Sequence, residues 1–131
     1  MKNSINKKFK NKNFIEALKN AINGLVVAFK TESNIKIDFV ATIFVVIACF
    51  IIKVTYLELL AIVLTIGLVI FAEMFNSVAE NIVDMITEEY NERAKIIKDI
   101  SAGAVLVTSI TAIFVAAIIF VNKYIVFYGG M

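Results

Sequence analysis

The sequence predicts an all-α integral membrane protein with an N-terminal amphipathic helix on the membrane surface and three transmembrane helices. The chain is 60% hydrophobic and its mean hydropathy is +0.87, whereas ordinary globular domains are about 45–50% apolar. Its 131 residues form one domain over residues 1–131, which is too small to bury that much apolar surface in a soluble fold. The apolar residues are concentrated in three long runs, which is typical of membrane spans.

The first segment, residues 1–12, is a basic tail. The first thirteen residues carry five lysines and no acidic residue. No apolar core and no small-residue cleavage site follow, so the segment does not have the pattern of a signal peptide. We expect this tail to lie beside anionic lipid headgroups.

Residues 13–30 are expected to form the surface helix. Apolar residues recur there at steps of three or four, namely Phe14, Leu18, Ile22, Leu25 and Phe29. This spacing indicates one apolar face on a helix. The segment is too polar to span a bilayer, so we expect it to lie in the membrane interface. The next residues, "TESNIKID", are predicted to be a linker.

Three membrane helices are predicted at residues 37–56, 57–87 and 93–122. Uncharged runs cover residues 39–52, 59–72 and 100–122. A span needs about 20 residues, so the first two helices reach that length only when their polar ends are included. The small residues of "SAGA" at the start of the third span would let another helix approach closely.

The basic residues predict the orientation of the chain. With a cytoplasmic N-terminus, eleven of the 13 lysines and arginines lie on the inner side, and only Lys53 and Lys123 lie outside. This distribution follows the positive-inside rule. We therefore expect a multi-pass protein with a cytoplasmic N-terminus and an external C-terminus.

A stripe of polar residues lies on the cytoplasmic half of the second span. At 100° per residue, Glu73, Asn76, Glu80 and Asp84 fall within about 80° of one helix face. Carboxylates at membrane depth are costly and point to function. Three acids on one face repel one another unless a positive charge lies between them. One interpretation is a structural seam paired with lysines of the next helix; the other is a site for a cation and phosphate.

The ligand chemistry favours Mg²⁺. The chain has no histidine and a single cysteine, Cys49, so any metal must be bound through oxygen atoms. The five glycines form neither a P-loop nor a GxGxxG motif. A nucleotide would therefore be held by Mg²⁺, lysine side chains and helix ends.

The stretch "EMFNSVAENIVDMITEEY", followed by "AKIIKDISAGAVL", resembles the signature of the prokaryotic diacylglycerol kinase family. The resemblance covers residues 13–120. It implies a lipid kinase of the bacterial plasma membrane, with ATP as donor and Mg²⁺ as cofactor. It also implies a homotrimer whose active sites are shared between subunits, and no nucleic-acid partner.

The same resemblance implies roles for individual residues. Glu73 would be the catalytic base, and Asn76 would position the reacting groups. Glu80 and Glu32 would bind Mg²⁺, and Asp84 would support the site. Nucleotide contacts would come from Glu32, Glu80, Glu89, Tyr90, Asn91, Lys98 and Asp99.

Four functions are compatible with these features. The stretch "ESNIKIDF" resembles the Gram-positive branch of the family, although that branch usually has a histidine at the position of Asp38. Members of this branch act mostly on undecaprenol. Phosphorylation of undecaprenol at the inner face of the membrane is therefore the leading hypothesis, and phosphorylation of diacylglycerol is the alternative. A proton-coupled transporter would need carboxylates deep in a span and access from both sides. A membrane scaffold would use the acids only in ion pairs.

Overall fold

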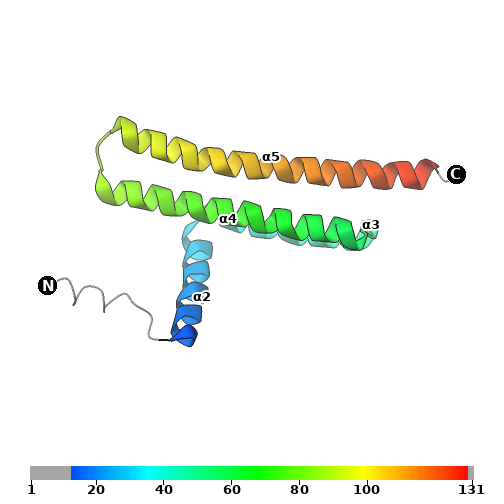
Figure 1. Ribbon diagram of the computed structural model, residues 1–131, viewed down its shortest axis with the longest axis horizontal. Helices are drawn as coiled ribbons and strands as arrows, with labels where there is room; N and C mark the ends of the chain where they lie inside the picture. Colours follow the sequence, from blue (N-terminus) through cyan, green and yellow to red (C-terminus); the bar gives the residue numbers. More distant parts are fainter. Residues whose placement is uncertain (1–12, 130–131) are drawn as a thin grey trace.

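The structure, a computed structural model, describes residues 13–129, and this part of the chain is helical apart from short connections (Figure 1). The predicted basic tail at residues 1–12 lies outside the described residues. The helices are α2 (Phe14–Thr31), α3 (Ser33–Ile52), α4 (Tyr56–Ile86) and α5 (Glu92–Gly129).

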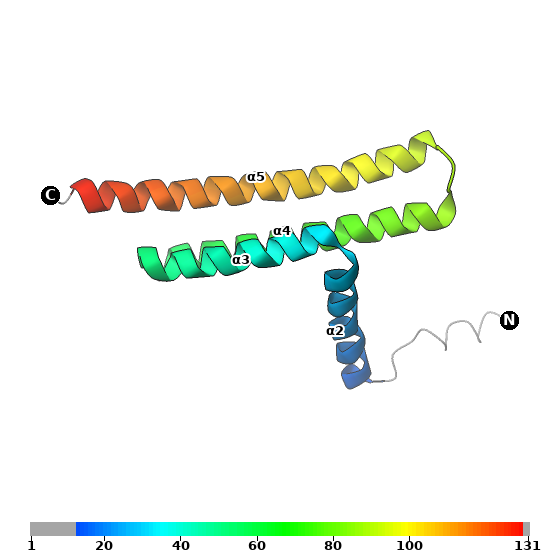
Figure 2. The ribbon, with the colours of Figure 1, turned by 180° about the vertical axis from the view of Figure 1, so that it is seen from behind.

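Helix α2 begins one residue later than predicted and is followed by a sharp change of direction. Asn13 caps it, because its side-chain oxygen accepts a hydrogen bond from the backbone N–H of Glu16 at 2.8 Å. Glu32 is extended and separates α2 from α3. Figures 1 and 2 show that α2 lies at a steep angle to the other three helices, which run alongside one another.

The predicted linker at residues 31–38 is wrong, since α3 starts at Ser33 and only Glu32 leaves the helical conformation. The polar residues of that stretch form the first turns of α3, where a membrane helix meets headgroups and water. The expected span at 37–56 also ends too late. Lys53 adopts the left-handed conformation, with φ of 51°, and closes α3 after Ile52.

A capping box starts α4. The Thr55 backbone N–H donates to the Glu58 carboxylate at 2.6 Å, and the Glu58 backbone N–H donates to the Thr55 hydroxyl at 3.3 Å. This reciprocal pair satisfies donors that a helix start leaves open. Both ends of α4 lie within one residue of the predicted 57–87.

Helix α5 continues well past the predicted end at residue 122 and reaches Gly129. The polar residues that were expected to end it are used in contacts with other helices. Asn122 donates to Glu58 at 3.4 Å, and Lys123 forms an ion pair with Glu58 at 2.9 Å. Lys123 also donates to the backbone carbonyl of Lys53 at 3.1 Å. We call Lys53, Glu58, Asn122 and Lys123 the interhelical clasp.

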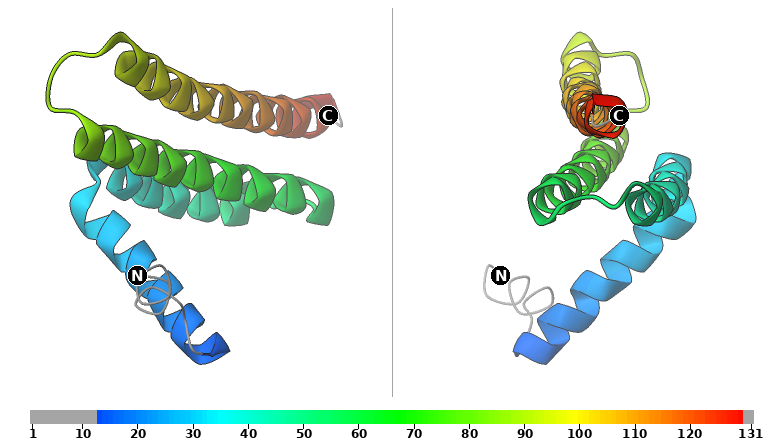
Figure 3. Two further views of the ribbon diagram at one scale, coloured as in Figure 1. Left: turned by 60° about the vertical axis from the view of Figure 1, so that its left-hand side comes forward. Right: turned by 90° about the vertical axis from the view of Figure 1, so that its right-hand side faces the viewer.

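The helices pack as a layer centred on α4, with α5 antiparallel along it and α3 beside it (Figure 3). Helices α3, α4 and residues 92–126 of α5 are each long and apolar enough to cross a membrane, as the prediction of three spans requires. The apolar core is small, and most large apolar side chains are exposed, including Phe50 at 81%. Such a surface requires lipid or another protein chain to cover it.

Candidate active site

The end of the α4 stripe that contains Glu73 and Asn76 is a buried polar site facing α3. Glu73 and Asn76 are only 7% and 8% exposed, in a protein whose surface is mostly uncovered. Asn34 of α3 donates a hydrogen bond to Glu73, with 3.4 Å between Nδ2 and Oε2. The charges of Asp38, Glu80 and Glu32 also act on Glu73. Glu80 lies seven positions along α4 from Glu73, and Glu32 lies in the α2–α3 break two positions before Asn34. Both predicted metal ligands are therefore on elements that adjoin the predicted base.

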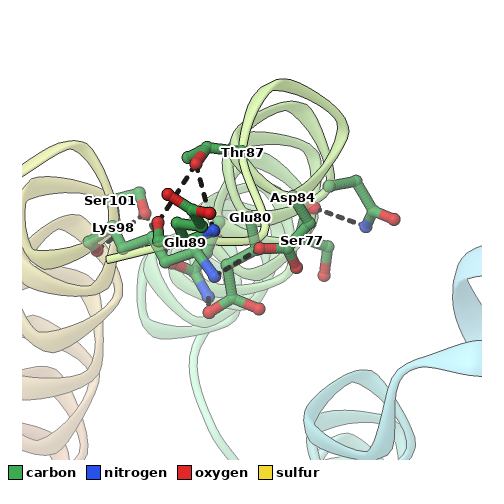
Figure 4. A network of polar contacts seen from close by, with 9 residues as sticks. Ser77, Glu80, Asp84, Thr87, Glu89, Lys98 and Ser101 are labelled. Carbon is green, nitrogen blue, oxygen red and sulfur yellow. Dashed lines mark hydrogen bonds and ion pairs between the residues drawn. The ribbon is translucent and has the colours of Figure 1, made fainter. Parts of the chain in front are cut away.

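The middle of the stripe is linked to α5 by a chain of hydrogen bonds. The Ser101 hydroxyl donates to Asn76 Oδ1 at 2.7 Å, and Asn76 Nδ2 donates to Glu80 Oε1 at 3.1 Å. Ser101 also lies 2.9 Å from the backbone carbonyl of Lys98. Figure 4 shows Glu80, Ser101 and Lys98 gathered where α4 and α5 face each other.

The opposite end of the stripe, at Asp84, forms an ion pair with α5. Lys98 of α5 contacts Asp84 of α4 at 2.6 Å, and both side chains are well exposed. Lys95 instead pairs with Asp99, one turn along its own helix. In residues 13–129 no lysine pairs with Glu73 or Glu80. Ion pairing between α4 and α5 therefore accounts for Asp84 but does not explain Glu73 and Glu80.

A polar hollow of about 440 Å³ lies beside this end. It brings together all five residues predicted to contact nucleotide through the loop and α5, and Asp84 with them: Asp84, Glu89, Tyr90, Asn91, Lys98 and Asp99. Its loop is held locally, since the Thr87 hydroxyl accepts a hydrogen bond from the Glu89 backbone N–H at 3.2 Å. The Asn91 side chain accepts from the backbone N–H groups of Arg93 and Ala94 at the start of α5.

The carboxylates offer an incomplete set of metal ligands. Among the described residues, no group of three His, Cys, Asp or Glu side chains is arranged to hold a metal ion. Glu80 on α4 and Glu32 at the α2–α3 break nevertheless supply carboxylate oxygens on the two elements that meet at the Asn34–Glu73 contact. Two carboxylates are enough for Mg²⁺. This cation usually takes one or two protein carboxylates and completes its coordination shell with phosphate oxygens and water.

Three residues of the site were missed by the sequence interpretation: Asn34, Asp38 and Ser101. Asn34 follows Glu32 by two positions, but it was placed in the wrongly predicted linker. Ser101 was assigned only to close helix packing. Asp38 was noted as a departure from a family pattern, yet its Oδ2 atom is buried with no hydrogen-bond partner among the described residues. It borders an apolar hollow of about 250 Å³ between α3, α4 and α5.

The family profile described as prokaryotic diacylglycerol kinase matches residues 19–120. The chain belongs to the prokaryotic diacylglycerol kinase family. It is similar to an undecaprenol kinase of Bacillus subtilis (strain 168), with 31% identity over 110 residues that cover 84% of this chain and 89% of the relative. It is also similar to a diacylglycerol kinase of Synechocystis, with 33% identity over 104 residues that cover 79% of this chain and 59% of that relative.

Membership of this kinase family decides the reaction class. The chain is a lipid kinase, a phosphotransferase with an alcohol group as acceptor. The transporter and scaffold alternatives are thereby set aside. Together with the three apolar helices, the family also makes the chain a bacterial membrane protein.

Proposed function

We propose that this kinase transfers the γ-phosphate of ATP to undecaprenol at the inner face of the plasma membrane. The observation that carries the proposal is the order of groups along α4. A buried carboxylate, Glu73, lies at the apolar end of the stripe, and the polar hollow around Asp84 and Lys98 lies at the other end. A lipid alcohol and a charged nucleotide approach such a site from opposite directions.

The choice of lipid is supported by the relatives. The Bacillus protein, named an undecaprenol kinase, matches over nearly its whole length. The Synechocystis protein, named a diacylglycerol kinase, matches over 59% of its length. Diacylglycerol remains the second candidate acceptor, because both lipids present one hydroxyl group at the interface.

In the proposed reaction, Glu73 takes the proton of the lipid hydroxyl. The hydroxyl oxygen forms a bond to the γ-phosphorus, and the bond from that phosphorus to the bridging oxygen breaks, so that ADP leaves. General-base catalysis of this kind contributes about 10²- to 10⁴-fold in rate. Asn34 and Asn76 hold the polar groups of the site in place around the base.

Glu32 and Glu80 would hold Mg²⁺, whose charge, when it is bound, neutralises the phosphates during transfer. Lys98 adds a second positive charge at the same end, since its ammonium group interacts with both Asp84 and Glu80. Glu89, Tyr90, Asn91 and Asp99 line the hollow that would receive the nucleotide. With these roles, the charged nucleotide stays at the polar end of the stripe, near Asp84 and Lys98.

We also propose that the kinase is a homotrimer with shared active sites. One chain leaves Asp84 64% exposed and leaves most large apolar side chains uncovered, so a single subunit does not enclose both substrates. In this arrangement α2 lies on the inner membrane surface, the N-terminus is cytoplasmic and the C-terminus is external. The lysine distribution supports that orientation.

The direct test is phosphoryl transfer from labelled ATP by pure protein in mixed micelles containing Mg²⁺. Undecaprenol, diacylglycerol and micelles without an acceptor lipid are compared side by side. We expect label in undecaprenyl phosphate, with a higher kcat/KM than for diacylglycerol. A higher kcat/KM for diacylglycerol would replace undecaprenol with the second candidate, and label in neither lipid would refute both.

A further inference from the structure

Ser101 is the least exposed of the buried polar residues, at 2% of its surface. It lies on α5, but its hydroxyl reaches across to Asn76 Oδ1 on α4 at 2.7 Å. The neighbouring threonines of α5 behave differently. Thr108 and Thr111 donate only to backbone carbonyls of their own helix. Ser101 is therefore a hydroxyl of α5 that reaches the α4 stripe.

The Asn76 amide lies between the Ser101 hydroxyl and the Glu80 carboxylate. An asparagine side chain has an oxygen that accepts and an NH₂ group that donates. Because the Glu80 carboxylate only accepts, the NH₂ group is turned toward it and donates to Oε1 at 3.1 Å. Oδ1 is then left to accept from the Ser101 hydroxyl. The reversed amide would place its oxygen against the Glu80 carboxylate, and two acceptors repel. The Ser101 hydroxyl, which also lies within hydrogen-bonding distance of the Lys98 carbonyl, thus supplies the donor that completes this orientation of the Asn76 amide.

We propose that Ser101 is a positioning residue that acts through Asn76 to orient the Glu80 carboxylate for a divalent cation. This inference rests on the proposed function, in which Glu80 is a ligand of Mg²⁺. Ligating carboxylates are themselves hydrogen-bonded, and losing such an outer partner typically weakens metal binding by about 10- to 100-fold. Removal of the hydroxyl also leaves Asn76 Oδ1 buried without a donor, which favours other orientations of the amide.

The competing explanation is that Ser101 is only a small residue that allows α4 and α5 to approach. It is followed by Ala102, Gly103 and Ala104, and small residues are common at contacts between membrane helices. Under that explanation Ser101→Ala leaves metal binding unchanged, because alanine is as small as serine.

The test measures binding of Mn²⁺, as a paramagnetic substitute for Mg²⁺, by electron paramagnetic resonance. The full chain is used in detergent with an excess of β,γ-imido-ATP. We expect Ser101→Ala to raise the Kd for Mn²⁺ by about tenfold or more. Thr108→Val, which removes an α5 hydroxyl that bonds only within its helix, serves as the matched control and is expected to keep the wild-type Kd. A wild-type Kd for Ser101→Ala would overturn the inference.

A double-mutant cycle tests whether the effect passes through Asn76. In an Asn76→Ala background, Ser101→Ala is expected to cause no further rise in the Kd, because the linking amide is gone. Equal effects in both backgrounds would contradict the relay. If Ser101→Ala does not fold, Ser101→Cys keeps the shape of the side chain with a slightly larger volume and weakens the donor, and the same rise in Kd is expected. A wild-type Kd for Ser101→Cys would then count against the inference.

Glu80→Gln separates this inference from the proposed function. If Glu80→Gln binds Mn²⁺ as the wild type does, the assignment of Glu80 as a metal ligand fails, and the role of Ser101 fails with it. If Glu80→Gln loses Mn²⁺ while Ser101→Ala keeps the wild-type Kd, only the role of Ser101 is wrong.

Discussion

Asn34 in the first turns of α3 donates a hydrogen bond to Glu73 in the middle of α4, with 3.4 Å between Nδ2 and Oε2. The two residues are 39 positions apart in the chain. The bond fixes one oxygen of the buried carboxylate and leaves the other available to a hydroxyl group. It therefore links the fold of α3 directly to the proposed chemistry.

Replacing Asn34 by alanine should lower kcat about tenfold, since hydrogen bonds to charged groups contribute roughly 1.5–3 kcal/mol and a misplaced base reacts slowly. Steady-state kinetics on the lipid acceptor measure this change. Asn81→Ala is the control, because the Asn81 amide bonds only to the Ser77 carbonyl one turn away. If both variants lose the same activity, Asn34 has no special role in positioning Glu73.

Glu32→Gln and Glu80→Gln should each raise the Mg²⁺ concentration needed for half-maximal activity, because a neutral amide is a weak ligand for this cation. Titration of phosphoryl transfer with Mg²⁺ at fixed ATP measures the change. Glu92→Gln, in the first turn of α5, removes a carboxylate outside the stripe and should behave as the wild type. An unchanged Mg²⁺ requirement in both test variants would remove Glu32 and Glu80 as ligands.

The interhelical clasp should stabilise the fold without taking part in catalysis. Lys123→Met removes the ion pair with Glu58 and the hydrogen bond to the Lys53 carbonyl. We expect a lower unfolding temperature in detergent than for Lys30→Met, while the kcat of the folded enzyme stays near the wild-type value. An unfolding temperature equal to that of Lys30→Met would show that the clasp contributes nothing measurable.

Shared active sites predict complementation between defective chains. Within one chain the charge of Glu32 already acts on Glu73, and a site built inside one subunit gains nothing from mixing Glu73→Gln chains with Glu32→Gln chains. If Glu32 of one subunit instead serves Glu73 of a neighbouring subunit, mixing restores a fraction of intact sites. Activity of the co-reconstituted mixture should then exceed that of either variant alone. A mixture that never exceeds the better single variant contradicts sharing between these two residues.

The sequence predicts the helices well but their ends less well. Apolar runs and three-to-four spacing identify α2 and the three spans. The end of α5 depends on contacts between Lys123, Glu58 and the Lys53 carbonyl, and local sequence does not reveal these long-range bonds. The start of α3 was missed because polar residues of its first turns resemble a loop when the membrane boundary is not known.

The candidate site was likewise predicted only in part. Glu73, Asn76, Glu80 and Asp84 share one face because they share one helix, so spacing alone groups them. Their partners Asn34 and Ser101 come from other helices, and the rotation of α3 and α5 about their axes determines whether those side chains face α4. The residues predicted to contact nucleotide beyond the stripe came from the family resemblance, and the polar hollow brings together those of the loop and α5.

Glu73→Gln tests the central claim most directly, because it replaces the proposed base with a nearly isosteric amide. Single-turnover transfer from labelled ATP to undecaprenol is measured together with equilibrium binding of β,γ-imido-ATP. We predict a transfer rate lower by about 10²-fold or more, the usual contribution of a general base, with nucleotide affinity and unfolding temperature close to those of the wild type. A near-normal transfer rate for Glu73→Gln would contradict the account and would make the buried carboxylate a structural group.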